Sequence, residues 1–217
     1  MSGAWEQSPS VLTAVLHTEM TTMAWSLGLR KLLPLDMPIL PVTGRPYDMG
    51  RNFMCQQMLD HGFDWLFMLD SDVIPPPDAI LRLMSHNLPL VSGVYHRRSP
   101  PHGLPVMCRN GKFMESYPAN SLIEVDVVGA GCLLIRRDLL EAMKPIDPVR
   151  GKHWFDWRVD MAHMLPPGEG LSEDFAFNLH VRRQLGVKII VDTGVQAKHV
   201  GLSEAYFGGL KPCEAIG

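Results

Sequence analysis

The sequence lacks the features that mark several common protein classes. Its 217 residues include four cysteines and no CxxC pair, so neither a zinc knuckle nor a disulfide framework is indicated, and a reducing compartment is the simplest expectation. No basic and apolar signal segment opens the chain, and no apolar run approaches the ~20 residues that a membrane span needs. We therefore expect a protein without a membrane span, in the cytoplasm, or in the host cytoplasm if the chain is viral.

Strong charge and familiar nucleotide-binding fingerprints are also missing. The formal net charge is −3, so no global field attracts nucleic acid or an acidic membrane. Neither a P-loop nor a GxGxxG fingerprint occurs, and no internal repeat or low-complexity tract is visible. Because 46% of the residues are hydrophobic, the chain can bury a sizeable core, which excludes global disorder.

Apolar runs of strand length alternate with runs of helical periodicity along the chain. Strands are expected within residues 10–19, 37–44, 65–69, 89–95, 121–136 and 187–192. Helices are expected within residues 20–33, 48–59, 77–86, 137–143 and 172–186. This alternation predicts an α/β fold with a mostly parallel sheet covered by helices on both faces.

Turn residues add detail to this outline. Asn110-Gly111 suits a type I′ turn, so residues 106–117 are expected to form a small β-hairpin. Gly62 and Gly186 are placed to end helices. We expect a flexible N-terminal tail at 1–10, a single domain at 11–203 and a C-terminal tail at 204–217. Within the domain, residues 145–170 are rich in Pro, Gly, Trp and His with little periodicity, which is typical of an irregular binding insert or lid.

The clearest chemical signal is a pair of carboxylates at the end of a strand. Asp70 and Asp72 directly follow the apolar run Trp65–Leu69, and ligands of such sheets collect at the carboxyl ends of the strands. Two close carboxylates repel each other unless a cation lies near them. Hard divalent cations prefer carboxylate oxygen and often share it with phosphate. The pair therefore predicts a metal–diphosphate site, although Asp and Ser also occur together in simple capped turns.

Three ordered blocks resemble nucleotide-sugar glycosyltransferases of the GT-A fold, of the family-2-like kind that carries a DxD motif. The blocks are "FDWLFMLDSDVIPPPDAILRLM", "DVVGAGCLLIRRDLLEAM" and "LSEDFAFNLHVRRQLGVKIIVDTGVQAKHVG". The resemblance covers roughly residues 10 to 201. It implies a Rossmann-like GT-A domain, with residues 145–170 as an acceptor-side insert. It also implies a hexosyl- or pentosyltransferase that uses a nucleoside-diphosphate sugar, with a UDP-sugar favoured and inversion preferred.

The resemblance assigns a metal role to three residues. Asp72 would ligate Mn²⁺ or Mg²⁺, and Asp70 would bind the donor ribose or the metal through water. His199, after the last strand, resembles the third ligand, and a nitrogen ligand favours Mn²⁺ over Mg²⁺. A lone histidine is also a common surface or core residue.

The "ED" pair receives the catalytic role by the same resemblance. Asp174 would deprotonate the acceptor hydroxyl, which requires a carboxylate within hydrogen-bond reach. Glu173 would orient the acceptor or a loop. Two acids after Ser172 also suit a helix start, through its dipole and an N-cap.

Further residues are candidates for donor or acceptor contacts. Guanidinium groups bind phosphate bidentately, and the arginines are otherwise ordinary solvated charges. The donor candidates are Arg45, Arg51, Asn52, His17 and Thr18. The last two belong to "LHTEM", where the family has a proline-containing turn. Other candidates are Arg97 and Arg98 for phosphate or acceptor, Gly129 and Gly131 for close approach of a sugar, and Trp154 and Trp157 for sugar stacking or loop anchoring.

Other functions and several acceptors stay open at this level. A nucleotidyltransferase also pairs carboxylates with metal, but "LHTEMTTM" lacks the usual glycine-rich basic loop. A non-catalytic nucleotide-sugar-binding module is a second alternative, and a haloacid-dehalogenase-type phosphatase a third. The acceptor is a glycan, a small molecule or a modified DNA base. Three basic pairs are compatible with DNA, namely Arg97-Arg98, Arg136-Arg137 and Arg182-Arg183. The oligomeric state is left undetermined.

Overall fold

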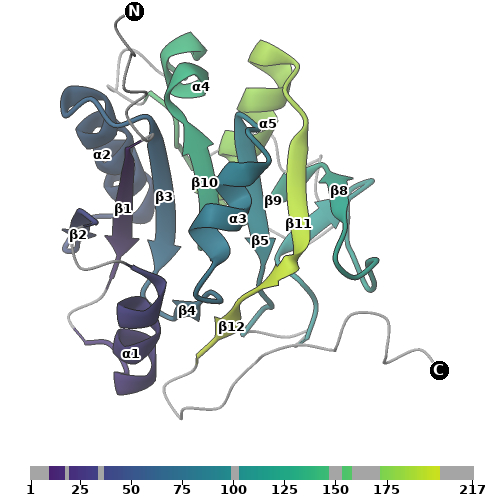
Figure 1. The fold of residues 1–217 in the computed structure, drawn as a ribbon. Coiled ribbons are helices and arrows are strands. Elements are labelled where there is room, and N and C mark those ends of the chain that lie inside the picture. Colours follow the sequence, from purple (N-terminus) through teal and green to yellow (C-terminus); the bar gives the residue numbers. More distant parts are fainter. Residues whose placement is uncertain are drawn as a thin grey trace, which may run out of the picture.

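A seven-stranded mixed sheet runs through the middle of the domain (Figure 1). The computed structural model describes residues 10–17, 20–33, 37–98, 103–146, 153–157 and 172–200. In spatial order the strands are β2 (Ile39–Val42), β1 (Val11–Leu16), β3 (Trp65–Asp70), β10 (Cys132–Arg136), β5 (Leu90–Val94), β11 (Ile189–Gln196) and β8 (Leu122–Val125). Strands β10 and β8 run antiparallel to their neighbours, and the other five share one direction. The predicted mostly parallel sheet is confirmed.

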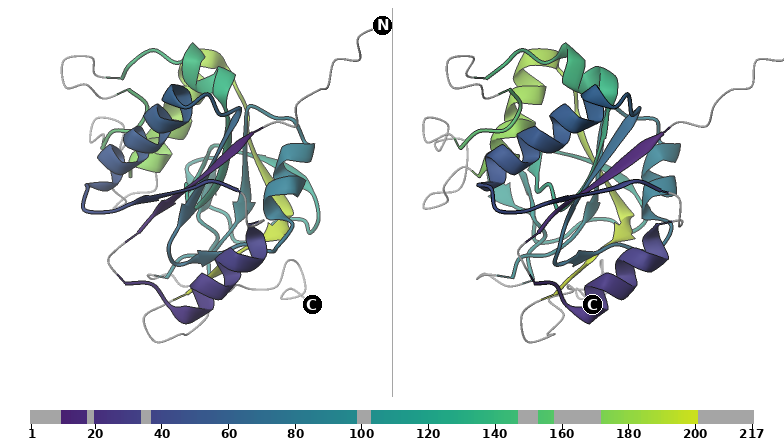
Figure 2. Two further views of the ribbon diagram at one scale, coloured as in Figure 1. Left: turned by 60° about the vertical axis from the view of Figure 1, so that its left-hand side comes forward. Right: turned by 90° about the vertical axis from the view of Figure 1, so that its left-hand side faces the viewer.

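Helices cover both faces of this sheet (Figure 2). On one face lie α2 (Tyr47–Asp60), α4 (Arg137–Ala142) and α5 (Glu173–Leu185), and on the other lie α1 (Met23–Leu32) and α3 (Ala79–Ser85). Side chains alternate along the central strand, so Leu66 and Met68 join the first layer while Phe67 and Leu69 join the second. A strand buried on both faces reads as a continuous apolar run, which is why residues 65–69 show no polar alternation.

Two small sheets extend the domain. Strands β6 (Met107–Arg109), β7 (Lys112–Phe113) and β9 (Val127–Val128) form one of them. The predicted hairpin joins β6 to β7, and Asn110 and Gly111 have φ of 54° and 69°, as a type I′ turn requires. In the other sheet, β12 (Lys198–His199) pairs with β4 (Val73–Ile74). This second pairing places the end of the described chain beside the residues that directly follow the DxD motif.

The helix ends predicted at Gly62 and Gly186 agree with the structure, whereas the start of α3 and the end of β11 do not. Gly186 caps α5 with φ 66°, and Gly62 follows α2 with φ 80°. Helix α3 begins at Ala79 and not at Pro77, because a turn closed by Ala79 N donating to Pro76 O comes first. Strand β11 extends to Gln196, beyond the expected end at residue 192. Within the described residues, no helix combines the length and apolar character needed to cross a bilayer.

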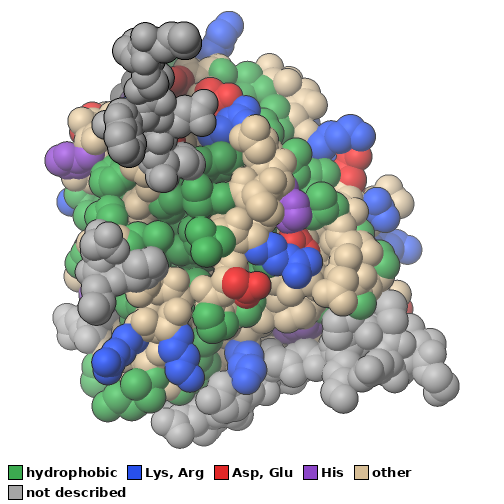
Figure 3. Space-filling view, viewed as in Figure 1, with side chains coloured by type: hydrophobic (Ala, Val, Ile, Leu, Met, Phe, Trp, Pro, Cys, Tyr) green, Lys and Arg blue, Asp and Glu red, His purple; other side chains and the backbone are tan. Residues whose placement is uncertain are grey.

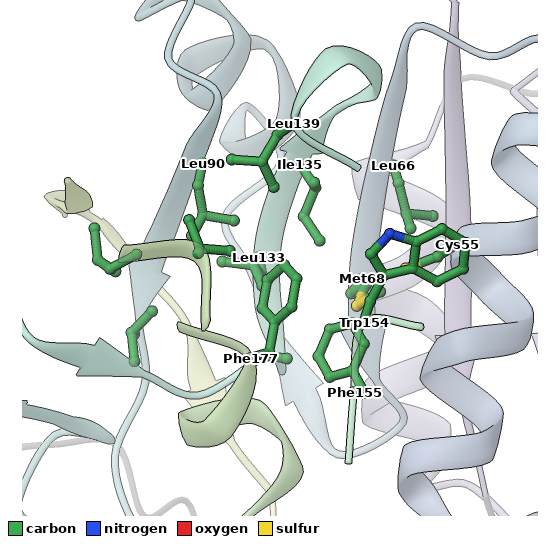
Figure 4. Close-up of a cluster of buried hydrophobic side chains, with 14 of the residues drawn as sticks. Cys55, Leu66, Met68, Leu90, Leu133, Ile135, Leu139, Trp154, Phe155 and Phe177 are labelled. Carbon is green, nitrogen blue, oxygen red and sulfur yellow. The ribbon is translucent and has the colours of Figure 1, made fainter. Parts of the chain in front are cut away.

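A short piece of the predicted insert packs into the core. Phe155 is fully buried and stacks on Phe177 with 4.3 Å between ring centroids (Figure 4). Asn52 holds the backbone of this piece, since its Oδ1 accepts from Trp154 N and Phe155 N and its Nδ2 donates to Phe155 O. The rest of the expected insert at 145–170, apart from residues 145–146 and 153–157, lies outside the described residues. So do the C-terminal tail and all of the N-terminal tail except Ser10.

This packing predicts that Phe155 matters for stability more than its aromatic neighbour Trp157. Phe155→Ala removes a fully buried ring and should lower the free energy of unfolding by about 3–5 kcal/mol. Trp157 is 50% exposed, so Trp157→Ala should change it by no more than about 0.5 kcal/mol. Urea unfolding of both variants measures the difference. Equal losses would show that the segment does not dock as described.

Candidate active site

A pocket of about 670 Å³ opens at the carboxyl ends of the parallel strands. This size suits a small-molecule or cofactor ligand, for which pockets of about 300–1,000 Å³ are usual. Of the predicted site residues, those that line it are His17, Arg51, Asp70, Asp72, Arg97, Arg98, Trp157, Glu173, Asp174 and His199. The structure therefore brings together segments that lie up to about 180 residues apart in the sequence, as expected for a site at the ends of adjacent strands.

Asp72 has a different partner on each carboxylate oxygen. Arg98 Nη1 lies 2.9 Å from Asp72 Oδ2, and His199 Nε2 lies 3.4 Å from Asp72 Oδ1. Burial opposes the charge on Asp72, but the hydrogen bond and charge of His199 and the charge of Arg98 outweigh it, so the pKa of this carboxyl lies below its ordinary value. Asp72 is therefore an anion that attracts cations into the pocket.

The hydrogen bonds of His199 fix which nitrogen faces Asp72. His199 Nδ1 lies 2.6 Å from the carbonyl oxygen of His96, and a carbonyl only accepts, so Nδ1 carries the proton. Nε2 faces Asp72 Oδ1: in the neutral ring it presents a lone pair that a bound cation could share with the carboxylate, and in the protonated ring it donates to that carboxylate. Metal-binding histidines commonly donate their other ring nitrogen to a backbone carbonyl in this way. The donor set therefore fits a divalent cation.

Among the described residues, Asp70, Asp72 and His199 do not form a single three-residue cluster. Within the part of the chain that the structure describes, no group of three or more His, Cys, Asp or Glu side chains is arranged to hold one ion. Asp72 and His199 form a pair, while Asp70 forms an ion pair with Arg51. A cation here would complete its shell with water and phosphate oxygens, as Mg²⁺ usually does at phosphate sites.

Arg51 is a buried link between acids. It is 4% exposed, and it donates to Asp70 Oδ1 at 3.2 Å, Glu173 Oε1 at 3.0 Å and Ala130 O at 3.3 Å. Burial opposes its charge, but the nearby carboxylates of Asp70, Glu173 and Asp174 outweigh that effect and raise its pKa above the ordinary value. The alternative that Arg51 is an ordinary solvated charge on its helix is therefore wrong. Its guanidinium group donates to acceptors of the protein.

Asp70 and Glu173 are both harder to ionise than ordinary carboxyls. Burial raises the pKa of Asp70, and the charges of Asp72 and Asp174 add to the rise, while Arg51 opposes it. Burial, reinforced by the charge of Asp174, raises the pKa of Glu173 to about 7 against the effect of Arg51. A carboxyl poised near neutral pH is typical of groups that handle protons.

Asp174 begins α5 in a fixed orientation. Its Oδ2 accepts from Ala130 N at 3.2 Å, and its Oδ1 accepts from Phe175 N at 2.8 Å and from the hydroxyl of Ser172. Ser172 occupies the N-cap position but makes no side-chain capping bond of its own, because its hydroxyl donates to Asp174. The carboxylate uses three of its roughly four acceptor positions, which leaves one for a ligand.

Tyr95 is a pocket residue that the sequence analysis missed. It follows β5 directly, its hydroxyl accepts from Gly131 N at 3.1 Å, and its ring meets that of His199 edge-on at 5.6 Å. Burial, with the charges of Asp70 and Asp174, raises its pKa well above 10.0. A Cβ on Gly131 would lie 2.9 Å from Asp70 Oδ2, and one on Gly129 would overlap the Tyr95 hydroxyl. These glycines thus make room for Tyr95 and Asp70.

Several predicted residues lie elsewhere. Arg45 places its guanidinium 4.4 Å from the ring centre of Phe53, and Asn52 anchors residues 154–155, so neither side chain lines the pocket. Trp154 is buried and donates to Leu140 O, which supports loop anchoring for this residue. Thr18 lies outside the described residues.

The other basic pairs do not extend the pocket. Arg136 forms an ion pair with Asp138, Arg137 with Glu141, and Arg182 with Asp126. Figure 3 shows acidic side chains next to basic ones in the upper and right parts of the face it presents, and a row of basic side chains at its lower left. In these three pairs the opposite charges lie side by side, which weakens the attraction of the arginines for a nucleic-acid backbone.

Comparisons with known proteins support the fold. No family model matches the chain, and no curated protein matches it in sequence. The structure of A197 from STIV matches with a TM-score of 0.63 and 16% identity over 93% of this chain and 95% of that one. Mannose-1-phosphate geranyltransferase from Thermus thermophilus matches more weakly, with a TM-score of 0.46 and 12% identity over 87% of this chain and 75% of that one. A putative nucleotide-diphospho-sugar transferase from Desulfovibrio desulfuricans matches with a TM-score of 0.41 and 9% identity over 85% of this chain and 80% of that one. The first match shows a shared fold, and the weaker two carry no argument.

The buried position of Arg51 predicts a large stability effect. Arg51→Met leaves Asp70 and Glu173 without their shared cation and should lower the free energy of unfolding by about 3–5 kcal/mol. The matched control is Arg45→Met, because Arg45 is exposed and its contact with Phe53 is worth about 0.5–1 kcal/mol. Urea unfolding at neutral pH compares them. A loss for Arg51→Met no greater than that for Arg45→Met would contradict the buried network.

Proposed function

We propose that this protein is a metal-dependent glycosyltransferase that transfers a sugar from a nucleoside-diphosphate sugar, with a UDP-sugar favoured, to an acceptor hydroxyl with inversion. The observation that carries this proposal is that one pocket contains two separate pairs of titratable side chains. Asp72 with His199 suits a cation, and Glu173 with Asp174 suits proton transfer. Arg51 and Asp70 connect the two pairs.

Asp72 and His199 would hold Mn²⁺ or Mg²⁺. When bound, the cation neutralises charge that develops on the leaving nucleoside diphosphate. His199 favours Mn²⁺ because imidazole is a softer ligand than carboxylate. Asp70, whose Oδ1 is taken by Arg51, would reach the donor ribose or a metal-bound water with its other oxygen.

Asp174 is the proposed general base, with Glu173 as its partner. The three hydrogen bonds to Asp174 hold its carboxylate in one orientation. Glu173 shares Arg51 with Asp70, so it joins the base to the metal side of the pocket. Inversion requires the base on the side of the sugar opposite the leaving group, and in the proposal Asp174 takes that side while the diphosphate lies at Asp72.

The acceptor would enter beside Trp157. This side chain lines the pocket and is 50% exposed, and its flat apolar surface suits a sugar ring or a nucleobase. Phe113 and Phe175, with ring centroids 6.2 Å apart, add apolar surface to the same pocket. A glycan, a small molecule and a modified DNA base are the acceptor classes that the proposal admits.

The metal role predicts a specific loss of affinity. Asp72→Asn should abolish the gain in UDP affinity that Mn²⁺ confers, and His199→Ala should reduce it, while metal-free UDP binding changes little. Asp78→Asn is the control, since Asp78 is exposed and does not line the pocket. Calorimetric titrations with and without Mn²⁺ measure each effect. An unchanged Mn²⁺-dependent gain in folded Asp72→Asn would contradict the assignment.

The base role predicts a loss of rate with little loss of donor affinity. General-base assistance is worth about 10²–10⁴-fold, so Asp174→Asn should slow hydrolysis of a UDP-sugar, with water as acceptor, by at least ~100-fold. UDP affinity should stay within about twofold, because the carboxylate touches the acceptor. The variant also loses the acceptor for Ala130 N, which costs about 1–3 kcal/mol of stability.

The matched variant is Glu173→Gln, and the reaction products separate the rival functions. If Glu173→Gln loses the rate while Asp174→Asn retains it, the base assignment is wrong. A binding module would leave UDP-sugars intact even in the wild type. A nucleotidyltransferase would release a sugar phosphate in place of free sugar and UDP.

A further inference from the structure

Arg98 makes an ion pair that the proposed chemistry does not explain. Its Nη1 lies 2.9 Å from Asp72 Oδ2, on the carboxylate assigned to the cation. The Arg98 side chain is 46% exposed and that of Asp72 is 28% exposed. An exposed pair of this kind is weak, at about 0–1 kcal/mol. The guanidinium therefore neutralises Asp72 without being fixed to it.

The other two arginines of the pocket are held differently. Arg51 has a 5% exposed side chain with three acceptors around it. Arg97, next in the chain to Arg98, lies over the ring of Phe113 at 4.4 Å. Arg98 thus pairs with Asp72, the residue proposed to ligate the metal directly.

We propose that Arg98 competes with the divalent cation for Asp72 and, once the cation takes that carboxylate, becomes a ligand of the donor diphosphate. This inference rests on the proposed function. The exchange gives the Arg98 guanidinium a second binding partner. It does not require the strands to move, because only a half-exposed side chain changes its contact.

The charges of the pocket support this exchange. Four carboxylates (Asp70, Asp72, Glu173 and Asp174) and three guanidinium groups (Arg51, Arg97 and Arg98) line it. A diphosphate adds further negative charge, which the bound cation offsets only in part. A guanidinium group displaced from Asp72 is then beside the incoming phosphates, to which its planar fork binds bidentately. The Arg98 side chain would thus pair with Asp72 when no ligand is bound, and with the diphosphate when the cation and the donor are bound.

Two binding measurements on one variant test the exchange, because the proposal predicts effects of opposite sign. Arg98→Met keeps much of the length of the side chain and removes its charge. Without nucleotide, Mn²⁺ should bind up to about fivefold more tightly, since its competitor is gone. With saturating Mn²⁺, UDP should bind about tenfold or more weakly, since a charged phosphate contact is lost. Electron paramagnetic resonance of free Mn²⁺ and calorimetry with UDP provide the two values.

Arg109→Met is the control, because Arg109 is exposed and does not line the pocket, and it should leave the affinity for Mn²⁺ alone unchanged. Arg98 is half exposed, so its variant should unfold at the wild-type temperature, which a thermal scan checks. If the wild type binds Mn²⁺ and UDP but Arg98→Met changes neither affinity, or weakens both, the proposed role of Arg98 is wrong. The proposed function would still stand in that case. A wild type that binds no Mn²⁺ at all would overturn both.

Discussion

The structure of the site depends on one buried cation, the guanidinium of Arg51. It joins the end of β3 through Asp70, the start of α5 through Glu173 and the loop before β10 through Ala130. If the carboxylates of Asp70 and Glu173 were buried without a cation, they would be protonated or excluded from the core. With Arg51 beside them, both carboxylates line the pocket next to Asp174, whose carboxylate accepts from the amide of Ala130. The acidic character of the pocket thus follows from a charge that helix α2 supplies.

A second constraint sets the position of the metal pair. Strand β12 pairs with β4 so that His199 lies opposite Val73, and Val200 N donates to Asp72 O at 2.7 Å. The carbonyl of His96 then fixes the ring of His199. Backbone hydrogen bonds therefore place the imidazole against the DxD carboxylate before any ligand enters, which is the preorganisation that a binding site needs.

Sequence patterns predicted the local features and the strand-end site, because these depend on short-range chemistry. Asn110-Gly111 forms the expected turn, Gly186 caps α5, and Asp70 and Asp72 follow a fully buried strand. Which individual strands run antiparallel could not be predicted in this way. An apolar run such as that of β10 has the same composition whether it pairs parallel or antiparallel, and its antiparallel pairing depends on contacts with β3 and β5.

The roles of individual polar residues were predicted less well, since they depend on distant partners. Arg51 meets Glu173 across 122 positions, and Asn52 meets Phe155 across 103. Nothing near either residue in the sequence indicates these contacts. Tyr95 was passed over because it ends an ordinary apolar strand, and its place in the pocket becomes evident only when Gly129 and Gly131 pack against it.

The most direct test of the account is a crystal structure of the wild-type protein soaked with Mn²⁺ and UDP, with anomalous scattering used to locate the metal. We expect one manganese peak about 2 Å from both an Asp72 carboxylate oxygen and His199 Nε2, with the diphosphate oxygens of UDP bound to it in the same pocket. A diphosphate bound elsewhere on the protein, or a metal that contacts neither Asp72 nor His199, would contradict the central claim that this strand end holds a cation which holds a diphosphate.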